Sequence, residues 1–328
     1  MSLENKKVLV TGGAGFIGSN IIEYLLQKNN KITCLDNFST GKKENIENFL
    51  DNPNFKLING DITKIEDCQK ATENIDIILH QAALGSVPRS IENPLKTNEV
   101  NISGFLNILW AAKNNKVSRV VYAASSSTYG DSKKLPKIES EIGLPLSPYA
   151  VTKYVNELYA GVFSNLYGLE LIGLRYFNVF GRKQDPDGAY AAAIPKFIKS
   201  FINHQSPILH GDGSQSRDFT YIDNVIQANE LAATTKNTDA LNQVYNVACG
   251  NQSLLIELIE NLKSLLSNFD PEIKNITVIN GPERVGDVKH SLASIEKANK
   301  LLGYNPSHTL KEGLSSAIEW YWNYFKIN

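Results

Sequence analysis

Apolar and polar positions follow two different periods along the first half of the chain. Short aliphatic runs that end in glycine or serine predict buried strands, and apolar residues at helical spacing between them predict helices. Strands are expected at residues 7–11, 31–36, 55–59, 76–80, 119–124 and 169–175. The main helices are expected at residues 16–27, 63–72, 98–114 and 149–167. This alternation predicts an α/β fold with a doubly wound parallel sheet and helices on both faces.

The regular alternation ends near residue 180. Residues 181–188 are polar and rich in turn formers, and short strand-like runs mixed with helices follow. No linker rich in proline or serine marks the change. We therefore expect a Rossmann-like domain at residues 1–180 and a smaller mixed α/β domain at 181–328, with segments of the second returning to the first.

The first predicted strand runs into the glycine-rich sequence TGGAGFIG at residues 11–18, and a helix follows at once. Such a turn directs backbone N–H groups and the positive end of a helix dipole at one spot, which suits a pyrophosphate. Gly12 permits the turn, Gly15 lets a phosphate approach the backbone, and Gly18 lets helix and strand pack closely. A plain structural turn is the alternative when the glycines are considered alone.

Acidic and small residues follow the next strands. Asp36 ends the second strand, where a carboxylate can accept bonds from both adenosine ribose hydroxyls and would repel a 2′-phosphate. NAD is therefore expected in preference to NADP. Asp61 follows the third strand and is predicted to lie near the adenine, with capping of the next helix as the alternative. The small residues within 81–85, after the fourth strand, leave room for a dinucleotide.

A candidate acid–base pair lies on the predicted helix 149–167. Tyr149 and Lys153 have the spacing Y-x-x-x-K, so their side chains share a helix face. An ammonium beside a phenol lowers the pKa of the phenol and makes it a usable base near neutral pH. The spacing is common by chance, and a surface tyrosine with a solvated lysine is the alternative. Here the pair follows a strand tipped by Ser125, Ser126 and Ser127, which favours catalysis.

Composition excludes several other classes of function. The 328 residues are 42% hydrophobic and 20% charged, as in ordinary globular proteins. A net charge of −1 gives no overall field that would attract nucleic acid or an anionic membrane. The N-terminal residues contain no apolar leader, and no later run has the length of a membrane span, so a cytoplasmic location is expected.

Cysteine and histidine positions point away from disulfides and metals. Cys34, Cys68 and Cys249 are widely spaced, and we interpret them as small hydrophobic residues within the fold. The five histidines show no metal-ligand spacing. No metal site is expected.

The order of these motifs resembles the extended short-chain dehydrogenase/reductases, and within them the nucleotide-sugar 4-epimerases. The resemblance covers nearly the whole chain. It is carried by TGGAGFIG at 11–18, AASSSTYG at 123–130, SPYAVTK at 147–153, RYFNVFG at 175–181, SRDFTYI at 216–222 and RVGD at 284–287. The segments 85–90 and 188–197 are most similar to epimerases of N-acetylated UDP-hexosamines. The resemblance implies an NAD-dependent UDP-N-acetylglucosamine 4-epimerase that forms a homodimer through the helices beginning near residues 98 and 149.

The resemblance also implies roles for individual residues. Tyr149 would be the base at the sugar 4-hydroxyl, Lys153 would tune it and hold the nicotinamide ribose, and Ser125 would share the 4-oxygen. Cofactor contacts are implied for Gly12, Gly15, Phe16, Ile17, Gly18, Asp36, Asn37, Asp61, Ile62, Gln81, Ala82, Ala83, Asn101, Tyr149 and Lys153. UDP-sugar contacts are implied for Gly85, Ser86, Ser125, Ser126, Tyr149, Asn178, Ala192, Ala193, Ile208, His210, Arg217, Arg284, Asp287 and Ser291.

The diphosphate and the uridine ribose have separate implied partners. Asn178, Arg217 and Arg284 would meet the diphosphate, since guanidinium forks suit phosphate oxygens. For the two arginines, an ordinary ion pair with the neighbouring Asp218 or Asp287 is the alternative. Asp287 itself is implied to accept a ribose hydroxyl.

Ser291 is implied to face the 2-substituent of the sugar. A bulky aromatic residue there would leave room only for a hydroxyl, whereas serine admits an N-acetyl group. Interconversion of UDP-GlcNAc and UDP-GalNAc is therefore expected. Capping of a predicted helix at 292–302 is another use of the same serine and is compatible with the first.

Rival activities differ at the serine-tipped strand. Related dehydratases need an acid pair where Ser126 and Ser127 stand, and related decarboxylases carry a glutamate in that stretch. UDP-glucose or UDP-glucuronate 4-epimerase activity stays open as an alternative. A non-catalytic NAD-binding protein is disfavoured, because Tyr149, Lys153 and the serine are all present.

Overall fold

The computed structural model describes residues 2–186, 192–282 and 289–327. Within these ranges seven parallel strands form one sheet in the order β11-β6-β5-β4-β1-β2-β3. The strands are β1 (Lys7–Thr11), β2 (Lys31–Asp36), β3 (Phe55–Asn59), β4 (Ile77–His80), β5 (Arg119–Ser125), β6 (Glu170–Tyr176) and β11 (Gln243–Val247). The reversal of strand order beside β1 makes this a doubly wound sheet, as predicted.

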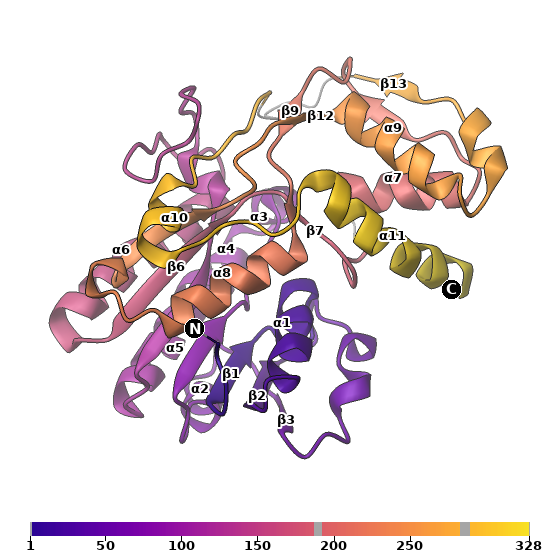
Figure 1. Ribbon diagram of the computed structural model, residues 1–328. Coiled ribbons are helices and arrows are strands. Elements are labelled where there is room, and N and C mark those ends of the chain that lie inside the picture. The colour runs from indigo at the N-terminus through magenta and orange to yellow at the C-terminus, as the bar shows by residue number, and fades with distance from the viewer. Residues whose placement is uncertain (1, 187–191, 283–288, 328) are drawn as a thin grey trace.

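The helices cover both faces of the sheet (Figure 1). In β1, Val8 and Val10 join the apolar cluster that contains α1 (Phe16–Leu26) and α8 (Ile222–Thr234), whereas Leu9 joins the cluster of α2 (Ile65–Ala71) and α5 (Gly104–Asn114). Alternate side chains of a strand point to opposite faces. Burial on both faces explains why the strands are almost continuously apolar.

The six strands and four main helices predicted from periodicity are confirmed, with small changes at their ends. The predicted helix 98–114 is instead α4 (Pro94–Asn98), a π-helical turn (Glu99–Ser103) and α5. The helix α6 (Pro148–Tyr167) starts at the N-cap Ser147, whose hydroxyl accepts from the Ala150 N–H at 3.1 Å. The short helix α3 (Val87–Glu92) was not predicted.

The strand β11 comes from beyond residue 180 and was also missed, because a polar residue interrupts its apolar pattern. Asn246 is fully buried, and its amide donates to the carbonyls of Lys137 and Ser294. Its side-chain oxygen accepts from the Tyr129 hydroxyl at 2.6 Å. These tertiary hydrogen bonds satisfy the buried amide, but their partners are distant in the sequence and cannot be predicted from it locally.

The rest of the chain forms a smaller layer of helices and short strand pairs, seen at the upper right of Figure 1. Its helices are α7 (Ala193–Ile202), α9 (Leu255–Leu266) and α11 (Leu310–Ile327), while α10 (Glu296–Leu302) packs near β11. The short strands are β7 (Val179–Phe180), β8 (Ile208–His210), β9 (Ser216–Arg217), β10 (Thr220–Tyr221), β12 (Ser253–Leu254) and β13 (Ile279–Gly281). One apolar cluster runs from β1 through α8 to α7, α9 and α11.

Two further sequence predictions concern membrane-spanning helices and the three cysteines. Across the described ranges, no helix combines the length and the apolar character that crossing a bilayer requires. Cys34, Cys68 and Cys249 are free thiols; the first two are buried and the third is half-buried. Their interpretation as small buried hydrophobic residues is confirmed for Cys34 and Cys68 and is wrong for Cys249, which is partly exposed.

Candidate active site

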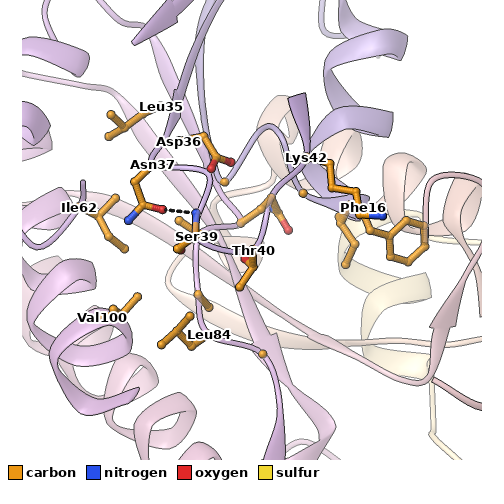
Figure 2. A pocket seen from close by; sticks show the side chains of 18 of the residues that line it. Phe16, Leu35, Asp36, Asn37, Ser39, Thr40, Lys42, Ile62, Leu84 and Val100 are labelled. Carbon is orange, nitrogen blue, oxygen red and sulfur yellow. Dashed lines mark hydrogen bonds between the residues drawn. The ribbon is translucent and has the colours of Figure 1, made fainter. Parts of the chain in front are cut away.

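A cavity of about 330 Å³ lies beyond the carboxyl ends of β1 to β4. We call it the glycine-loop cavity. Of the residues predicted to contact the cofactor, it is lined by Gly12, Gly15, Phe16, Ile17, Gly18, Asp36, Asn37, Asp61, Ile62, Gln81, Ala82 and Ala83. Ligands of doubly wound sheets bind at such a position. Figure 2 shows Ile62, Leu84 and Val100 on one side of this cavity and Lys42 beside Phe16 on the other.

The glycine turn has the geometry expected of a phosphate cradle. Gly12 has φ +67°, and a Cβ there would lie 2.8 Å from the backbone of Ala82. A Cβ on Gly18 would lie 2.3 Å from the Gly12 carbonyl oxygen. Gly15 is the N-cap of α1, and the first turn of that helix carries no acidic residue. The unpaired amides and the helix dipole therefore face the cavity without a competing anion.

Asp36 is held rigidly at the end of β2, with 8% of its surface exposed. Its Oδ2 accepts from the Ala14 N–H at 2.9 Å, and its Oδ1 accepts from the Phe38 N–H at 2.8 Å. Burial raises the pKa of the carboxyl group, and the two amide bonds oppose that rise. A carboxylate offers about four acceptor positions, so two are left for ribose hydroxyls.

Asp61 does not cap the helix that follows it, because α2 begins at Ile65 with Lys64 as N-cap. Instead its Oδ1 accepts from the backbone and hydroxyl of Thr63, both at 2.8 Å, and its Oδ2 accepts from the Asn37 amide at 2.8 Å. Partial burial raises the pKa of Asp61, but these hydrogen bonds lower it and the net change is downward. Asp61 and Asn37 therefore form one polar edge of the glycine-loop cavity.

Tyr149, Lys153 and Ser125 meet in a second cavity of about 230 Å³, the tyrosine cavity. It shares Ile17, Gln81, Ala83 and Gly85 with the glycine-loop cavity, and it shares Asn178 and Val179 with a third. The structure thus brings the predicted catalytic residues together between two larger cavities. Such a position would let a group bound on one side meet a group bound on the other.

The electrostatics of Tyr149 differ from the sequence prediction. Burial raises the pKa of the phenol, a hydrogen bond from Ser125 lowers it, and the net change is upward. The Lys153 ammonium donates to the Ala123 carbonyl at 2.7 Å, and burial lowers its pKa to about 8 against the opposing charge of Glu157. The prediction that Lys153 lowers the pKa of Tyr149 is wrong for this structure, since burial outweighs the hydrogen bond and the ammonium is engaged elsewhere.

Asn101, a predicted cofactor residue, lies behind the loop that follows β4. Its side-chain oxygen accepts from the Leu84 N–H at 2.8 Å, and its amide donates to the Thr152 hydroxyl at 3.1 Å. It is 2% exposed and lies within the π-helical turn. Asn101 therefore braces the cavity-lining loop against α6.

The third cavity, of about 660 Å³, lies beside the N-terminus of α7, and we call it the α7 cavity. It is lined by the predicted substrate residues Asn178, Ala192, Ala193, Ile208, His210 and Arg217. Residues not predicted from the sequence line it as well: Lys196, Lys199, Gln205 and Phe219. The signal that could have found the two lysines is their i, i+3 spacing on an amphipathic helix, which places both on one face.

Arg217 and its acidic neighbour Asp218 both contact the backbone of other segments. Its guanidinium donates to the carbonyls of Ser216 and Lys289, at 3.0 and 3.1 Å. Asp218 is fully buried and accepts from the backbone N–H groups of Cys249, at 2.9 Å, and of Gly250 and Ala293. Asp218 therefore ties backbone segments together, and Arg217 lies at the wall of the α7 cavity.

The other predicted substrate residues have local structural contacts. Ser86 caps α3 by accepting from the Arg89 N–H at 3.2 Å, and Ser126 begins a one-turn 3-10 helix. Ser291 is half-buried, and its N–H donates to the Ser216 carbonyl at 3.1 Å. It does not cap the helix predicted at 292–302, because α10 begins at Glu296. Arg284 and Asp287 lie outside the described residues.

Comparison with known proteins identifies the class of enzyme. The profile of the NAD dependent epimerase/dehydratase family matches residues 8–248. The chain belongs to this family. It is similar to the UDP-N-acetylglucosamine 4-epimerase of Methanobrevibacter ruminantium, solved in complex with UDP-N-acetylmuramic acid, at 40% identity and a TM-score of 0.91 over 98% of this chain and 100% of that one. NAD is therefore the cofactor of this protein.

Two further relatives are named as 4-epimerases of other UDP-sugars. The UDP-glucose 4-epimerase of Thermus thermophilus, solved in complex with NAD, is 30% identical with a TM-score of 0.83 over 96% of this chain and 98% of that one. The UDP-glucuronate 4-epimerase of Thermodesulfobacterium geofontis is 34% identical over 95% of both chains. The comparisons support NAD-dependent nucleotide-sugar 4-epimerase activity and leave the sugar undecided.

Proposed function

We propose that the protein interconverts UDP-GlcNAc and UDP-GalNAc by NAD-dependent epimerisation at C4. The observation that carries this proposal is the placement of Tyr149, Ser125 and Lys153 in a cavity that joins the glycine-loop cavity to the α7 cavity. The NAD would occupy the glycine-loop cavity, held by the turn at Gly12 and by Asp36. The UDP group would occupy the α7 cavity.

The proton chemistry falls to side chains of the tyrosine cavity. When bound, NAD supplies a reversible hydride acceptor for the sugar C4. Tyr149 would remove the proton of the 4-hydroxyl and return it after the sugar has turned over, as a general base and then a general acid. The hydrogen bond from Ser125 stabilises the phenolate, whereas burial opposes its formation. Lys153, on the same face of α6, would hold the nicotinamide ribose, as the family resemblance implies.

Cations of the α7 cavity would bind the diphosphate. Arg217 and Lys196 line it, and the net charge of the whole protein provides no general attraction for an anion. The helix α7 begins at Ala193, and its N-cap Ala192 provides no side-chain cap, so the backbone N–H groups of Ala193 and Ile194 would add donors at the same wall. Arg284 and Asp287, which lie outside the described residues, stay predictions as partners of the diphosphate and the uridine ribose.

The preference for an acetamido sugar rests on the size of Ser291 and on the Methanobrevibacter ruminantium relative. A serine leaves volume beside the sugar 2-position, in contrast to a large aromatic side chain. A 6-carboxylate, as in UDP-glucuronate, would favour a free cation in the tyrosine cavity. In the described chain Lys153 is the cation that lines this cavity, and its ammonium is bonded to Ala123. An uncharged hexosamine therefore suits the cavity better.

The direct test measures kcat/KM of the purified protein with UDP-GlcNAc, UDP-GalNAc, UDP-glucose, UDP-galactose and UDP-glucuronate. We expect the highest values for the two acetamido sugars, which should approach one equilibrium mixture from both sides. Turnover of UDP-glucuronate alone would support the uronate alternative. Turnover of the plain hexoses alone would refute the proposed role of Ser291.

We further infer a homodimer formed through α6 and its neighbours. Leu158, Val162 and Leu166 repeat every fourth residue on α6 and are 53%, 49% and 69% exposed. Trp110 of α5 packs its ring 6.1 Å from that of Tyr167 and is itself 40% exposed. A continuous apolar face of this kind suits a second copy of the chain. Changing Leu158 and Leu166 together to Glu should convert a dimer to a monomer in sedimentation experiments, and a monomeric unchanged protein would refute the inference.

A further inference from the structure

The turn after β5 fixes the orientation of one hydroxyl. Ser125 ends the strand, and the chain enters the 3-10 helix Ser126–Tyr129 at once. The Ser125 Oγ accepts from the Ser127 N–H at 3.2 Å and from the Ser127 hydroxyl at 2.9 Å. A serine oxygen has two acceptor lone pairs and one proton to donate. Both lone pairs are used by Ser127, so the Ser125 proton is left for a partner in the tyrosine cavity, which Ser125 and Tyr149 line together. Hydrogen bonding by Ser125 lowers the pKa of Tyr149, as a donated proton would.

We propose that Ser127 is a positioning residue that holds the Ser125 hydroxyl as a hydrogen-bond donor to the Tyr149 oxygen. This proposal rests on the proposed function, since it concerns the base of that reaction. It also excludes Ser125 as a relay for the proton, because an oxygen with both lone pairs occupied cannot accept another hydrogen bond. The proton would pass directly: the sugar O4–H bond would break and the Tyr149 O–H bond form as C4–O becomes a double bond. Bound NAD would supply the acceptor for the hydride that leaves C4.

Other titratable groups around Tyr149 come from three elements. On α6 itself, Lys153 has a pKa of about 8 and donates to Ala123. From β6, Tyr176 lines the same cavity, and burial raises its pKa to about 12. From β4, burial lowers the pKa of His80 to about 3, with Lys153 adding to the effect. Among the described residues, none of these groups is hydrogen-bonded to Ser127, so a change at residue 127 should leave their titration as it is.

The variants that test the proposal lie within one turn of chain. Ser127→Ala removes the donor hydroxyl, and Ser127→Thr keeps it. Thr128→Val is the matched control: this neighbouring side chain is fully buried, and its hydroxyl has no hydrogen-bond partner among the described residues. Valine has nearly the shape of threonine, so the control removes a hydroxyl from the same turn without removing a hydrogen bond.

The readout is the pH profile of kcat. In Ser127→Ala the Ser125 hydroxyl is free to rotate away, so the kinetic pKa of the base should rise by about one unit and kcat at pH 7 should fall about tenfold. The plateau at high pH and KM should stay near the wild-type values. Ser127→Thr and Thr128→Val should match the wild type. A wild-type profile in Ser127→Ala would overturn the proposal, and so would an equal loss at every pH, which indicates a merely structural role.

A second readout needs no sugar. The ultraviolet absorbance of tyrosinate, titrated in the wild type and in Tyr149→Phe, gives the ionisation of Tyr149 by difference. The same subtraction in the Ser127→Ala background should show this ionisation at higher pH. An unchanged titration would overturn the proposal whatever the substrate is. A shifted titration together with no turnover of any UDP-sugar would instead refute the proposed function and leave the role of Ser127 standing.

Discussion

The glycine-loop cavity and the α7 cavity are built in different ways. The first is built largely from backbone: a turn that only glycine accommodates at Gly12, a helix N-terminus, and Asp36 fixed by two amide bonds. The second is built from side chains of separate segments, among them Asn178, Lys196 and Arg217. A backbone cradle suits a cofactor that is common to a whole family, whereas side chains can be exchanged to change the sugar nucleotide. Variants in the glycine-loop cavity should therefore affect NAD, and variants in the α7 cavity should affect the sugar nucleotide.

The largest expected effect lies between the two cavities. Tyr149→Phe deletes one oxygen and preserves the ring, so kcat should fall by about 10²-fold or more, as expected for a general acid–base group. NAD content and KM should change little, because neither neighbouring cavity is altered. Both can be measured on one preparation, by nucleotide release on denaturation and by steady-state kinetics. Turnover near the wild-type rate would remove Tyr149 from the mechanism.

A substitution in the backbone cradle should act on the cofactor alone. Gly12→Ala places a Cβ 2.8 Å from the Ala82 backbone and forces a left-handed conformation, which costs about 1–2 kcal/mol before any steric clash is counted. The purified variant should therefore carry much less NAD. Gly161→Ala is the control, since a Cβ at that helical position meets nothing within 4 Å. Equal NAD content in the two variants would contradict the assignment of the cradle.

A substitution of Asp36 tests how the glycine-loop cavity selects NAD over NADP. Asp36→Ala removes the acceptors proposed for the ribose hydroxyls and the charge that would repel a 2′-phosphate. We expect NAD to bind about tenfold more weakly and the preference over NADP to shrink, as measured by titration of stripped protein with each nucleotide. Asp36→Asn should keep part of the affinity for NAD and lose the discrimination. An unchanged preference in both variants would place the selectivity elsewhere.

A substitution on the substrate side should change the choice of sugar. Ser291→Tyr should fill the volume beside the 2-position and exclude acetamido sugars while sparing plain hexoses, which is specificity by repulsion. The measurement is the ratio of kcat/KM for UDP-GlcNAc to that for UDP-glucose, which should fall by at least about tenfold. Ser291→Ala, which is also small, should keep the ratio. If tyrosine leaves the ratio unchanged, the pocket wall lies elsewhere.

The sequence predicted the cofactor half better than the substrate half, for physical reasons. Its strands are apolar on both faces and its turns carry local signals, so periodicity and the glycines at 12, 15 and 18 locate both the fold and the cavity. The edge strand β11 was missed because buried Asn246 is satisfied only by distant partners. Lys196 and Lys199 were missed because their importance depends on where α7 packs. The direction of the Tyr149 pKa was wrong because burial is a tertiary property.

In the proposed reaction, one enzyme-bound NAD would accept a hydride from C4 and return it to the other face of the same sugar. The test uses UDP-GlcNAc carrying deuterium at C4, incubated with the purified protein in ordinary water without added nucleotide. We expect UDP-GalNAc that still carries the deuterium at C4, because the label never leaves the active site. UDP-GalNAc that has lost the label to solvent, or no UDP-GalNAc at all, would contradict the proposed reaction.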